Sequence, residues 1–262
     1  ESAINIAFEF QEVSCSIIKH SNPCGFGTGK NNLEAYLNAV STDPVSYFGG
    51  IVGFNNEVDE VVANEINKSF LECIVAPSFS KKAFKKLKKK KNLRLISINK
   101  NNLVENFKEK MFRSVFNGIL IQDKDNHINE INNFDVVTKK KPTKKEYNSL
   151  ILGWKLVKFV KSNAIVFNNN NKLLGVGAGQ MSRVDSVKIA IRKSKENNID
   201  LNKAIMASDA FFPFSDCVEL AAKNGISGII QPGGSINDQE VVDLANKLNL
   251  FMVFTKERHF YH

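Results

Sequence analysis

The sequence lacks several features that would place it in a specialised class of protein. It has no apolar run of the roughly 18–20 residues that a membrane-spanning helix needs, and residues 1–8 lack the basic start and small-residue cleavage site of a secretory signal. Its four cysteines lie far apart and form no CxxC pair. Such spacing argues against a zinc site and is typical of reduced thiols. We therefore expect a cytoplasmic protein with no membrane partner and no bound metal.

Arginine is also scarce, although the net charge is +9. The positive charge comes mainly from lysine, which, like the abundant asparagine, isoleucine and phenylalanine, has A/T-rich codons. A nucleic-acid surface would be richer in arginine interleaved with aromatics. The densest run, Lys81–Lys91, places Ala83, Phe84 and Leu87 at helical spacing and predicts an amphipathic helix with a solvated lysine face. We therefore expect no nucleic-acid partner.

What is present is the composition of a globular protein. The chain has 262 residues, of which 43% are hydrophobic and 24% charged, enough for one large domain or two smaller ones. Short β-branched runs alternate with amphipathic segments, which predicts an α/β fold. Strands or extended segments are expected at 14–18, 51–54, 73–76, 93–98, 113–122, 164–167, 173–177, 203–207, 228–231 and 251–254, and helices at 33–40, 58–70, 81–91, 143–160, 182–197, 216–224 and 238–248.

Two segments are predicted to be irregular. The glycine-rich residues 21–29 are expected to form a loop, and the polar residues 126–145 a linker that divides the chain into two units. Thr143 with Glu146 is a capping-box pattern, which predicts that the next helix starts there.

The segment KHSNPCGFG, residues 19–27, follows the first predicted strand. Lys19 beside His20 can offer a cation and a base that titrates near neutral pH to one reacting centre. The alternative is a solvated Lys19 and a His20 that is satisfied in the core.

The segment GVGAGQMSR, residues 175–183, combines a GxGxG spacing with the start of a predicted helix. That spacing lets a backbone approach a ligand closely, and a helix N-terminus favours anions. No GKS or GKT follows, so this is not a Walker loop. The alternative is an ordinary strand-to-helix turn.

Two further segments combine aromatic, acidic and turn residues. In ASDAFFPFSD, residues 207–216, three phenylalanines between two aspartates could form a wall for a planar heterocycle, or could simply pack in the core. The turn QPGGS, residues 231–235, offers backbone donors and acceptors. Arg258, retained in a lysine-rich chain, suggests a bidentate contact such as phosphate, although a surface arginine is the alternative. Together the segments indicate a small-molecule enzyme with a planar anionic ligand.

In this order, the segments resemble the formyltransferase part of the bifunctional AICAR transformylase/IMP cyclohydrolase family of purine biosynthesis. The resemblance runs almost end to end and is weakest at residues 81–145. The stretches that carry it are KHSNPCG, DPVSYFGGIVGFN, CIVAP, SNAIVF, GVGAGQMSRVDSVKIA, ASDAFFPFSD, IIQPGGSINDQE and MVFTKERHF. The resemblance implies an α/β fold of two cytidine-deaminase-like three-layer subdomains without zinc, at residues 1–135 and 136–262.

The resemblance also implies a reaction. Members of the family transfer the formyl group of the cosubstrate 10-formyltetrahydrofolate to the amine of AICAR and so produce FAICAR, on the route to IMP. By resemblance, His20 accepts the proton of that amine, and Lys19 stabilises charge on the formyl oxygen or the departing folate nitrogen. The positions implied to bind AICAR are Gly49, Glu72, Asn163, Phe211 and Arg258, and those implied to bind folate are Arg183, Asp216, Ser235 and Ile236.

The chain departs from the family pattern at its amino-terminal side. The cyclohydrolase domain is absent, as is the Arg-Tyr-Gly-Glu-Asn-Pro segment that helps to bind AICAR, so ring closure to IMP is not expected from this chain. The family acts as a homodimer with shared sites, which implies a homodimer here. The alternative is an inactive truncated remnant that binds only nucleotide or folate.

Overall fold

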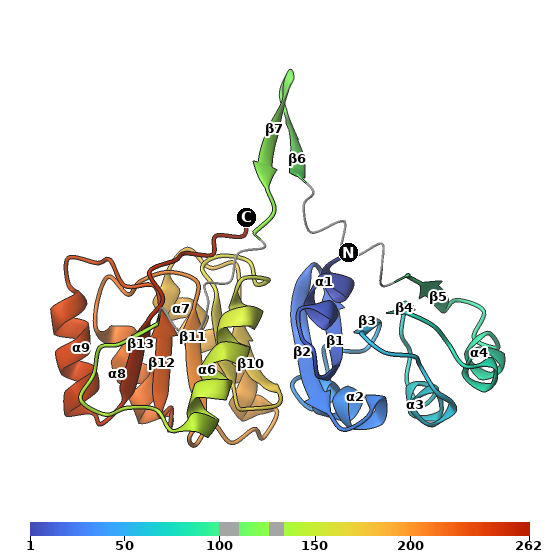
Figure 1. Ribbon diagram of the computed structural model, residues 1–262, viewed down its shortest axis with the longest axis horizontal. Helices are drawn as coiled ribbons and strands as arrows, with labels where there is room; N and C mark the ends of the chain where they lie inside the picture. Colours follow the sequence, from blue (N-terminus) through green and yellow to red (C-terminus); the bar gives the residue numbers. More distant parts are fainter. Residues whose placement is uncertain (100–109, 126–133) are drawn as a thin grey trace.

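Two β-sheets with the same strand order form the framework of the protein. The computed structural model describes residues 1–99, 110–125 and 134–262 (Figure 1). The first sheet has the order β2 (Asn22–Gly29), β1 (Val13–Lys19), β3 (Ile51–Phe54), β4 (Cys73–Ala76), β5 (Arg94–Ser97). The second has the order β10 (Leu173–Gly177), β9 (Ile165–Asn168), β11 (Ile205–Ser208), β12 (Gly228–Gln231), β13 (Phe251–Phe254), with the short β8 (Asp135–Val136) beyond β13.

The two sheets also share their strand directions. In each, an antiparallel hairpin, β1–β2 or β9–β10, pairs antiparallel with the first of three mutually parallel strands. The predicted α/β class is therefore confirmed. The likeness to cytidine deaminases and the division into 1–135 and 136–262 stay predictions.

Helices connect the strands and cover the sheets. They are α1 (Ser2–Phe8), α2 (Asn32–Val40), α3 (Glu60–Ile66), α4 (Lys81–Leu87), α6 (Lys144–Val157), α7 (Arg183–Glu196), α8 (Asp216–Lys223) and α9 (Asp238–Lys247). The predicted capping box is present, because the Thr143 hydroxyl accepts from the Glu146 backbone N–H while the Glu146 carboxylate accepts from the Thr143 N–H. The lysine run forms α4 with Ala83 and Leu87 buried, whereas Phe84 lies on the exposed side.

The prediction of a loop at residues 21–29 is wrong, because most of this segment is strand β2. Its glycines serve close packing: a Cβ atom on Gly25 would lie 2.3 Å from the carbonyl oxygen of Ala39 in α2. The same device recurs in β10, where a Cβ on Gly177 would lie 1.9 Å from the carbonyl oxygen of Ser186 in α7. Glycine therefore lets a helix lie directly on each edge strand. Close packing on α7 therefore accounts for Gly177, while the ligand interpretation of the GxGxG spacing stays a prediction.

The two sheets meet at their edge strands β2 and β10. Gly27 and Lys172 form an antiparallel bridge, and the Thr28 backbone N–H donates to the Asn171 carbonyl at 2.7 Å. A buried ion pair also joins the two halves. The Lys158 ammonium at the end of α6 lies 2.9 Å from the Glu9 carboxylate at the end of α1. One apolar cluster runs through both halves and includes Phe26 and Trp154.

A two-stranded hairpin, β6 (Lys110–Val115) and β7 (Gly118–Asp123), projects away from both sheets (Figure 1). It confirms the extended structure expected at 113–122. Of the expected linker 126–145, residues 126–133 lie outside the described part, and the remainder contains β8 and the start of α6. The expected helix at 58–70 is shorter, because α3 begins after its cap Asp59 and ends at Ile66.

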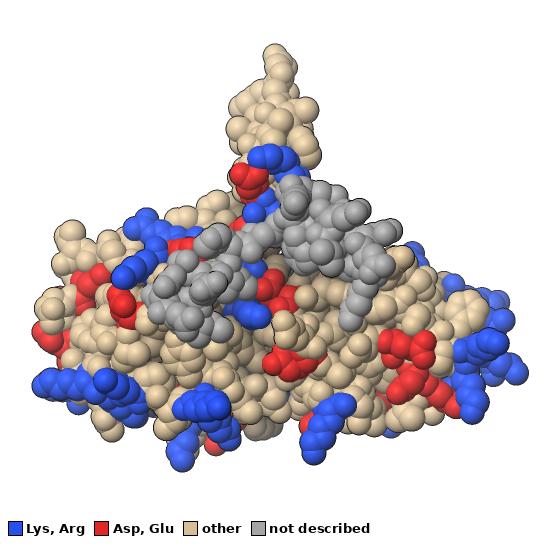
Figure 2. Space-filling view, in the orientation of Figure 1, with Lys and Arg blue, Asp and Glu red and all other residues tan. Residues whose placement is uncertain are grey.

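Basic and acidic side chains are interspersed over the face shown in Figure 2. On α4, for example, Lys82 and Lys86 both lie near the Glu60 carboxylate of α3. Among the described residues, no helix is both long enough and apolar enough to cross a bilayer.

The Glu9–Lys158 pair generates a stability prediction. Glu9→Gln leaves the ammonium of Lys158, whose side chain is 3% exposed, without its counter-charge. We expect a loss of about 3–5 kcal/mol in the free energy of unfolding, measured by urea denaturation. The control is Glu65→Gln, which breaks the exposed pair with Lys68 and should cost less than about 1 kcal/mol. Equal effects of the two substitutions would contradict the prediction.

Candidate active site at the edges of the two sheets

Three of the four singled-out segments meet at one edge of the second sheet. The chain enters β9, leaves β10 and leaves β11 at this edge, because β9 is antiparallel to both neighbours. The register pairs Ser208 with Ile165, so Asn163 and Asp209 come from adjacent strands. The carboxyl ends of the parallel strands β12 and β13 reach the same edge, which is where ligands bind in open α/β sheets.

A buried ion pair organises this edge. Asp209 is 0% exposed and Arg183, at the start of α7, 8% exposed. The Arg183 guanidinium forms an ion pair with the Asp209 carboxylate and donates to the Ser208 hydroxyl at 3.0 Å and to the Asn163 side-chain oxygen at 2.8 Å. The second carboxylate oxygen of Asp209 accepts from the Ser162 hydroxyl at 2.6 Å. Each polar group in the cluster therefore has a partner.

The cluster fixes the amide of Asn163. Its oxygen accepts from Arg183, and its nitrogen donates to the Gln180 carbonyl at 2.9 Å. Sequence reasoning treated Asp209 only as one of two acids near an aromatic wall and missed its pairing with Arg183. The sequence did contain a signal for this pairing, because Asp209 directly follows a buried strand, where a charged side chain requires a partner.

Arg258 lies on the exposed side of the same edge. Its guanidinium carbon is 4.8 Å from the centroid of the Phe211 ring, a cation–π contact. A Cβ atom on Gly234 would lie 3.6 Å from Arg258 Nη2. The structure thus brings Arg258, Phe211 and the QPGGS turn together. The expected aromatic wall is only partial, since Phe212 is buried in the core while Phe214 is 64% exposed.

The three other predicted folate positions lie at the starts of the next two helices. Asp216 begins α8, and Ser235 and Ile236 precede α9. The two loops are tied together, because the Asn237 side chain donates to the Pro213 carbonyl at 2.7 Å and the Ser215 hydroxyl donates to Glu240 at 2.9 Å. Asp216 and Ile236 are exposed to solvent.

Lys19 and His20 lie at the turn between β1 and β2. His20 is exposed, with a φ of 49°, so the core alternative for this residue is wrong. The Lys19 ammonium donates to the Phe48 carbonyl. It lies beside Gly49, where an added Cβ would be 3.5 Å from Lys19 Nζ. Glu72, at the start of β4, forms an ion pair of 2.9 Å with Arg94.

These first-sheet residues gather where β1 ends and where the parallel strands β3 and β4 begin. The reason is that β1 is antiparallel to β3, with Ile18 opposite Ile51. Asn22 joins the residues around His20 to the candidate residues at the edge of the second sheet. Its side-chain oxygen accepts from the Lys161 backbone N–H at 3.0 Å. Lys161 directly precedes Ser162 and Asn163, so the His20 turn adjoins the second-sheet edge.

The cysteine of the KHSNPCG motif, Cys24, has a thiol of low reactivity. Burial raises the pKa of the Cys24 thiol to about 12, and the thiol donates to the Ile17 carbonyl at 3.5 Å. A neutral thiol is a poor nucleophile and metal ligand. All four cysteines are free, and the described residues contain no cluster of three or more potential metal-binding side chains.

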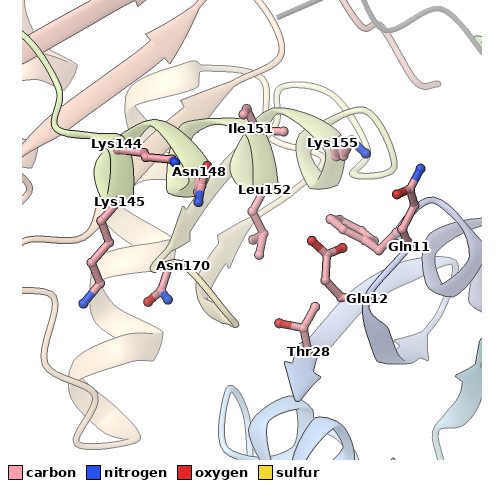
Figure 3. Close-up of a pocket in the computed structure, with 11 residues that line it drawn as sticks. Gln11, Glu12, Thr28, Lys144, Lys145, Asn148, Ile151, Leu152, Lys155 and Asn170 are labelled. Atoms are coloured by element: carbon pink, nitrogen blue, oxygen red, sulfur yellow. The ribbon is translucent and has the colours of Figure 1, made fainter. Parts of the chain in front are cut away.

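A separate cleft lies at the opposite end of the junction between the halves (Figure 3). It has a volume of about 720 Å³ and is bordered by α6, the segment after α1 and the β9–β10 turn. None of the predicted site residues lines it. The lining residues are Phe10, Gln11, Glu12, Thr28, Lys144, Lys145, Asn148, Ile151, Leu152, Lys155 and Asn170.

Comparison with known proteins places the chain in a family. A family model described as the AICARFT/IMPCHase bienzyme matches residues 1–193, and the chain belongs to this family. Relatives named bifunctional purine biosynthesis protein PurH are 48% identical over 267 residues in Persephonella marina, 49% over 262 residues in Listeria monocytogenes and 46% over 263 residues in Aquifex aeolicus. Each match covers 100% of this chain but 50–51% of the relative. The chain therefore spans about half the length of these relatives.

The buried ion pair at the second-sheet edge generates a second prediction. Asp209→Asn leaves the guanidinium of Arg183 buried without a counter-charge. We expect a loss of about 3–5 kcal/mol in unfolding free energy, measured by urea denaturation. The matched control is Asp243→Asn on the exposed side of α9, which should change it by about 0.5 kcal/mol or less. If Asp209→Asn behaved like this control, the pair would not organise the edge.

Proposed function

We propose that this chain is the formyltransferase half of the bifunctional enzyme, and that it transfers a formyl group from 10-formyltetrahydrofolate to the amine of AICAR. One observation carries the proposal: the Asn22–Lys161 hydrogen bond places the exposed His20 turn next to the edge that holds Asn163 and Arg258. The proposed base thereby comes near the oriented amide of Asn163, on the edge that also carries Arg258. The membership of the family supports purine biosynthesis as the setting.

In this proposal, His20 takes a proton from the AICAR amine as the amine nitrogen attacks the formyl carbon. A new carbon–nitrogen bond forms, and the bond from the formyl carbon to the folate nitrogen breaks. That nitrogen gains one proton as it leaves as tetrahydrofolate, which balances the proton that His20 takes from the amine. Lys19 stabilises the negative charge on the formyl oxygen or on the departing nitrogen. Holding both reactants in line supplies much of the rate.

The residues proposed to bind AICAR suit different parts of that nucleotide. Arg258 is exposed beside Gly234 and suits the phosphate. Glu72 suits the ribose hydroxyls, and Gly49 offers its backbone. Asn163, whose amide is already oriented by Arg183, suits the carboxamide or the formyl group. Phe211 provides a ring face under Arg258.

The folate positions follow from the helix starts beside this edge. Asp216 suits the N–H donors of the pterin, and Ser235 and Ile236 lie in the neighbouring loop before α9. The guanidinium of Arg183 carries five N–H donors, so it would contact folate through those that its bonds to Asp209, Ser208 and Asn163 leave over. The free thiols support a reducing compartment, the cytoplasm, as the location.

A substitution of the proposed base tests the activity. His20→Ala should lower kcat by about 10²–10⁴-fold without changing the unfolding free energy by more than about 0.5 kcal/mol, because His20 is an exposed turn residue. The release of tetrahydrofolate from 10-formyltetrahydrofolate in the presence of AICAR provides the assay. The control is Lys30→Ala, an exposed change at the other end of β2 that should retain full activity.

Three outcomes are distinguishable. Full activity in His20→Ala would remove His20 from the mechanism. An inactive parent chain, beside an active longer natural chain, would mean that the site is incomplete without the rest of the protein. An inactive parent that still bound AICAR or folate would favour the alternative of an inactive remnant.

We also propose that the chain forms a homodimer, with the β6–β7 hairpin at the interface. Phe112, Ile119 and Ile121 lie on one face of the hairpin and are 60–68% exposed. An apolar two-stranded ribbon of this kind is only marginally stable in water, and covering it by a second copy removes the apolar surface from solvent.

The dimer is tested by a charge placed on the hairpin. Phe112→Asp should shift the chain from dimer to monomer in sedimentation velocity, because it would place a charge in an apolar interface. Phe84→Asp on α4 is the matched control, since Phe84 is also exposed but lies away from the hairpin. A parent that sediments as a monomer would contradict the proposal, as would equal dissociation in both variants.

A further inference from the structure

The segment after β13 carries Arg258 across the edge of the second sheet. Residues 255–262 form neither helix nor strand, so individual bonds set their path. The Thr255 N–H donates to the Gln231 carbonyl and the Lys256 N–H to the Pro232 carbonyl, both at 3.0 Å. The next backbone anchor is the His259 N–H, which donates to the Asp209 carbonyl at 3.0 Å. Arg258 lies between these anchors.

His259 points the opposite way from Arg258. Its side chain is 2% exposed and packs against the ring of Trp154 of α6, with ring centroids 4.5 Å apart and ring planes tilted by 48°. On either side of the buried His259, Arg258 and Phe260 are exposed. Holding His259 inward therefore directs Arg258 outward, over Phe211.

The polar contact of the His259 ring is with Asp125. His259 Nδ1 lies 2.6 Å from an Asp125 carboxylate oxygen, so this nitrogen carries the proton. The other ring nitrogen, Nε2, is buried and has no hydrogen-bond partner among the described residues. The orientation of the ring thus depends on its packing against Trp154 and on this one carboxylate.

Asp125 comes from a distant part of the chain. It follows the end of β7 by two residues, so it lies at the base of the projecting hairpin. Figure 1 shows the carboxyl terminus beside this base. The bond therefore ties the hairpin to the segment that presents Arg258.

We propose that Asp125 and His259 are positioning residues that hold Arg258 toward the anionic group of the substrate. The inference rests on the proposed function for the identity of that substrate. Neither residue contacts the reacting atoms in this scheme, and both act through Arg258. A charged hydrogen bond to a carboxylate is strong enough for this task, and losing such outer-shell partners of a ligand-binding group costs 10–100-fold in metal sites.

The test separates positioning from general stabilisation. Asp125→Ala should raise the KM for AICAR about tenfold while kcat and the KM for folate stay within about twofold. Asp125→Asn retains an oxygen that accepts from Nδ1 and should recover most of the affinity. His259→Phe keeps the ring but loses the donor, so it should match Asp125→Ala, and the double variant should be no worse than either.

The matched control is Asp123→Asn. Asp123 is an exposed hairpin carboxylate two residues away that pairs with Lys110 instead of the tail, and its variant should have parental constants. The inference is overturned if Asp125→Ala resembles this control, or if it raises the KM for AICAR and for folate equally.

A second measurement does not depend on activity. Hydrogen exchange of the His259 amide should be faster in Asp125→Ala than in the parent chain, and unchanged in Asp123→Asn. If neither the parent chain nor the longer natural chain transfers a formyl group, the proposed function fails, while this comparison still decides whether Asp125 holds the tail. Equal exchange in Asp125→Ala and the parent would overturn the inference.

Discussion

The ion pair between Arg183 and Asp209 is the interaction on which the candidate site depends. Both groups are buried, so each requires the other. Through this pair, the start of α7 is joined to the end of β11, and Asn163 at the start of β9 is joined to both. The Asp209 carbonyl also accepts from His259 in the tail that carries Arg258. Four segments that are far apart in sequence therefore take their positions from one charge pair.

A second constraint is the close approach of helices to the edge strands. Gly25 in β2 and Gly177 in β10 leave room for the backbones of α2 and α7. Because α7 lies so close to β10, its first residue, Arg183, reaches the buried carboxylate of Asp209. The GxGxG pattern, which resembles a ligand-binding loop, thus contributes to the site indirectly, because it lets α7 pack close to the sheet.

Much of the fold could be predicted from the sequence because its signals are local. The strands at 51–54, 73–76, 173–177, 228–231 and 251–254 have the predicted bounds, since short β-branched runs end at turn residues. The capping box located α6 for the same reason. The strand β2 could not be predicted, because its glycines make sense only against α2, and that contact is tertiary.

For the candidate site, the sequence pointed to most of the residues at the two edges but not to what holds them. The contacts that position the site join residues distant along the chain, as between Ser162 and Asp209 or between Asn22 and Lys161. No local sequence pattern predicts such pairs. The expectation that ligand groups lie at carboxyl ends holds for the second sheet. In the first sheet, Lys19 and His20 follow the carboxyl end of β1, but this end lies beside the amino ends of the parallel strands, because β1 is antiparallel to β3, and that direction is a property of the assembled sheet.

The shared strand order gives the molecule an approximate internal twofold relation. Since β2 and β10 run antiparallel, the hairpin turn of each half lies against the open end of the other half's hairpin. The turn containing His20 meets Lys161 at one end, and the turn containing Asn171 meets Thr28 at the other. The lysine-bordered cleft of Figure 3 is therefore the structural counterpart of the candidate site. This is the arrangement expected of a duplicated ancestral unit whose two equivalent ends have since acquired different side chains.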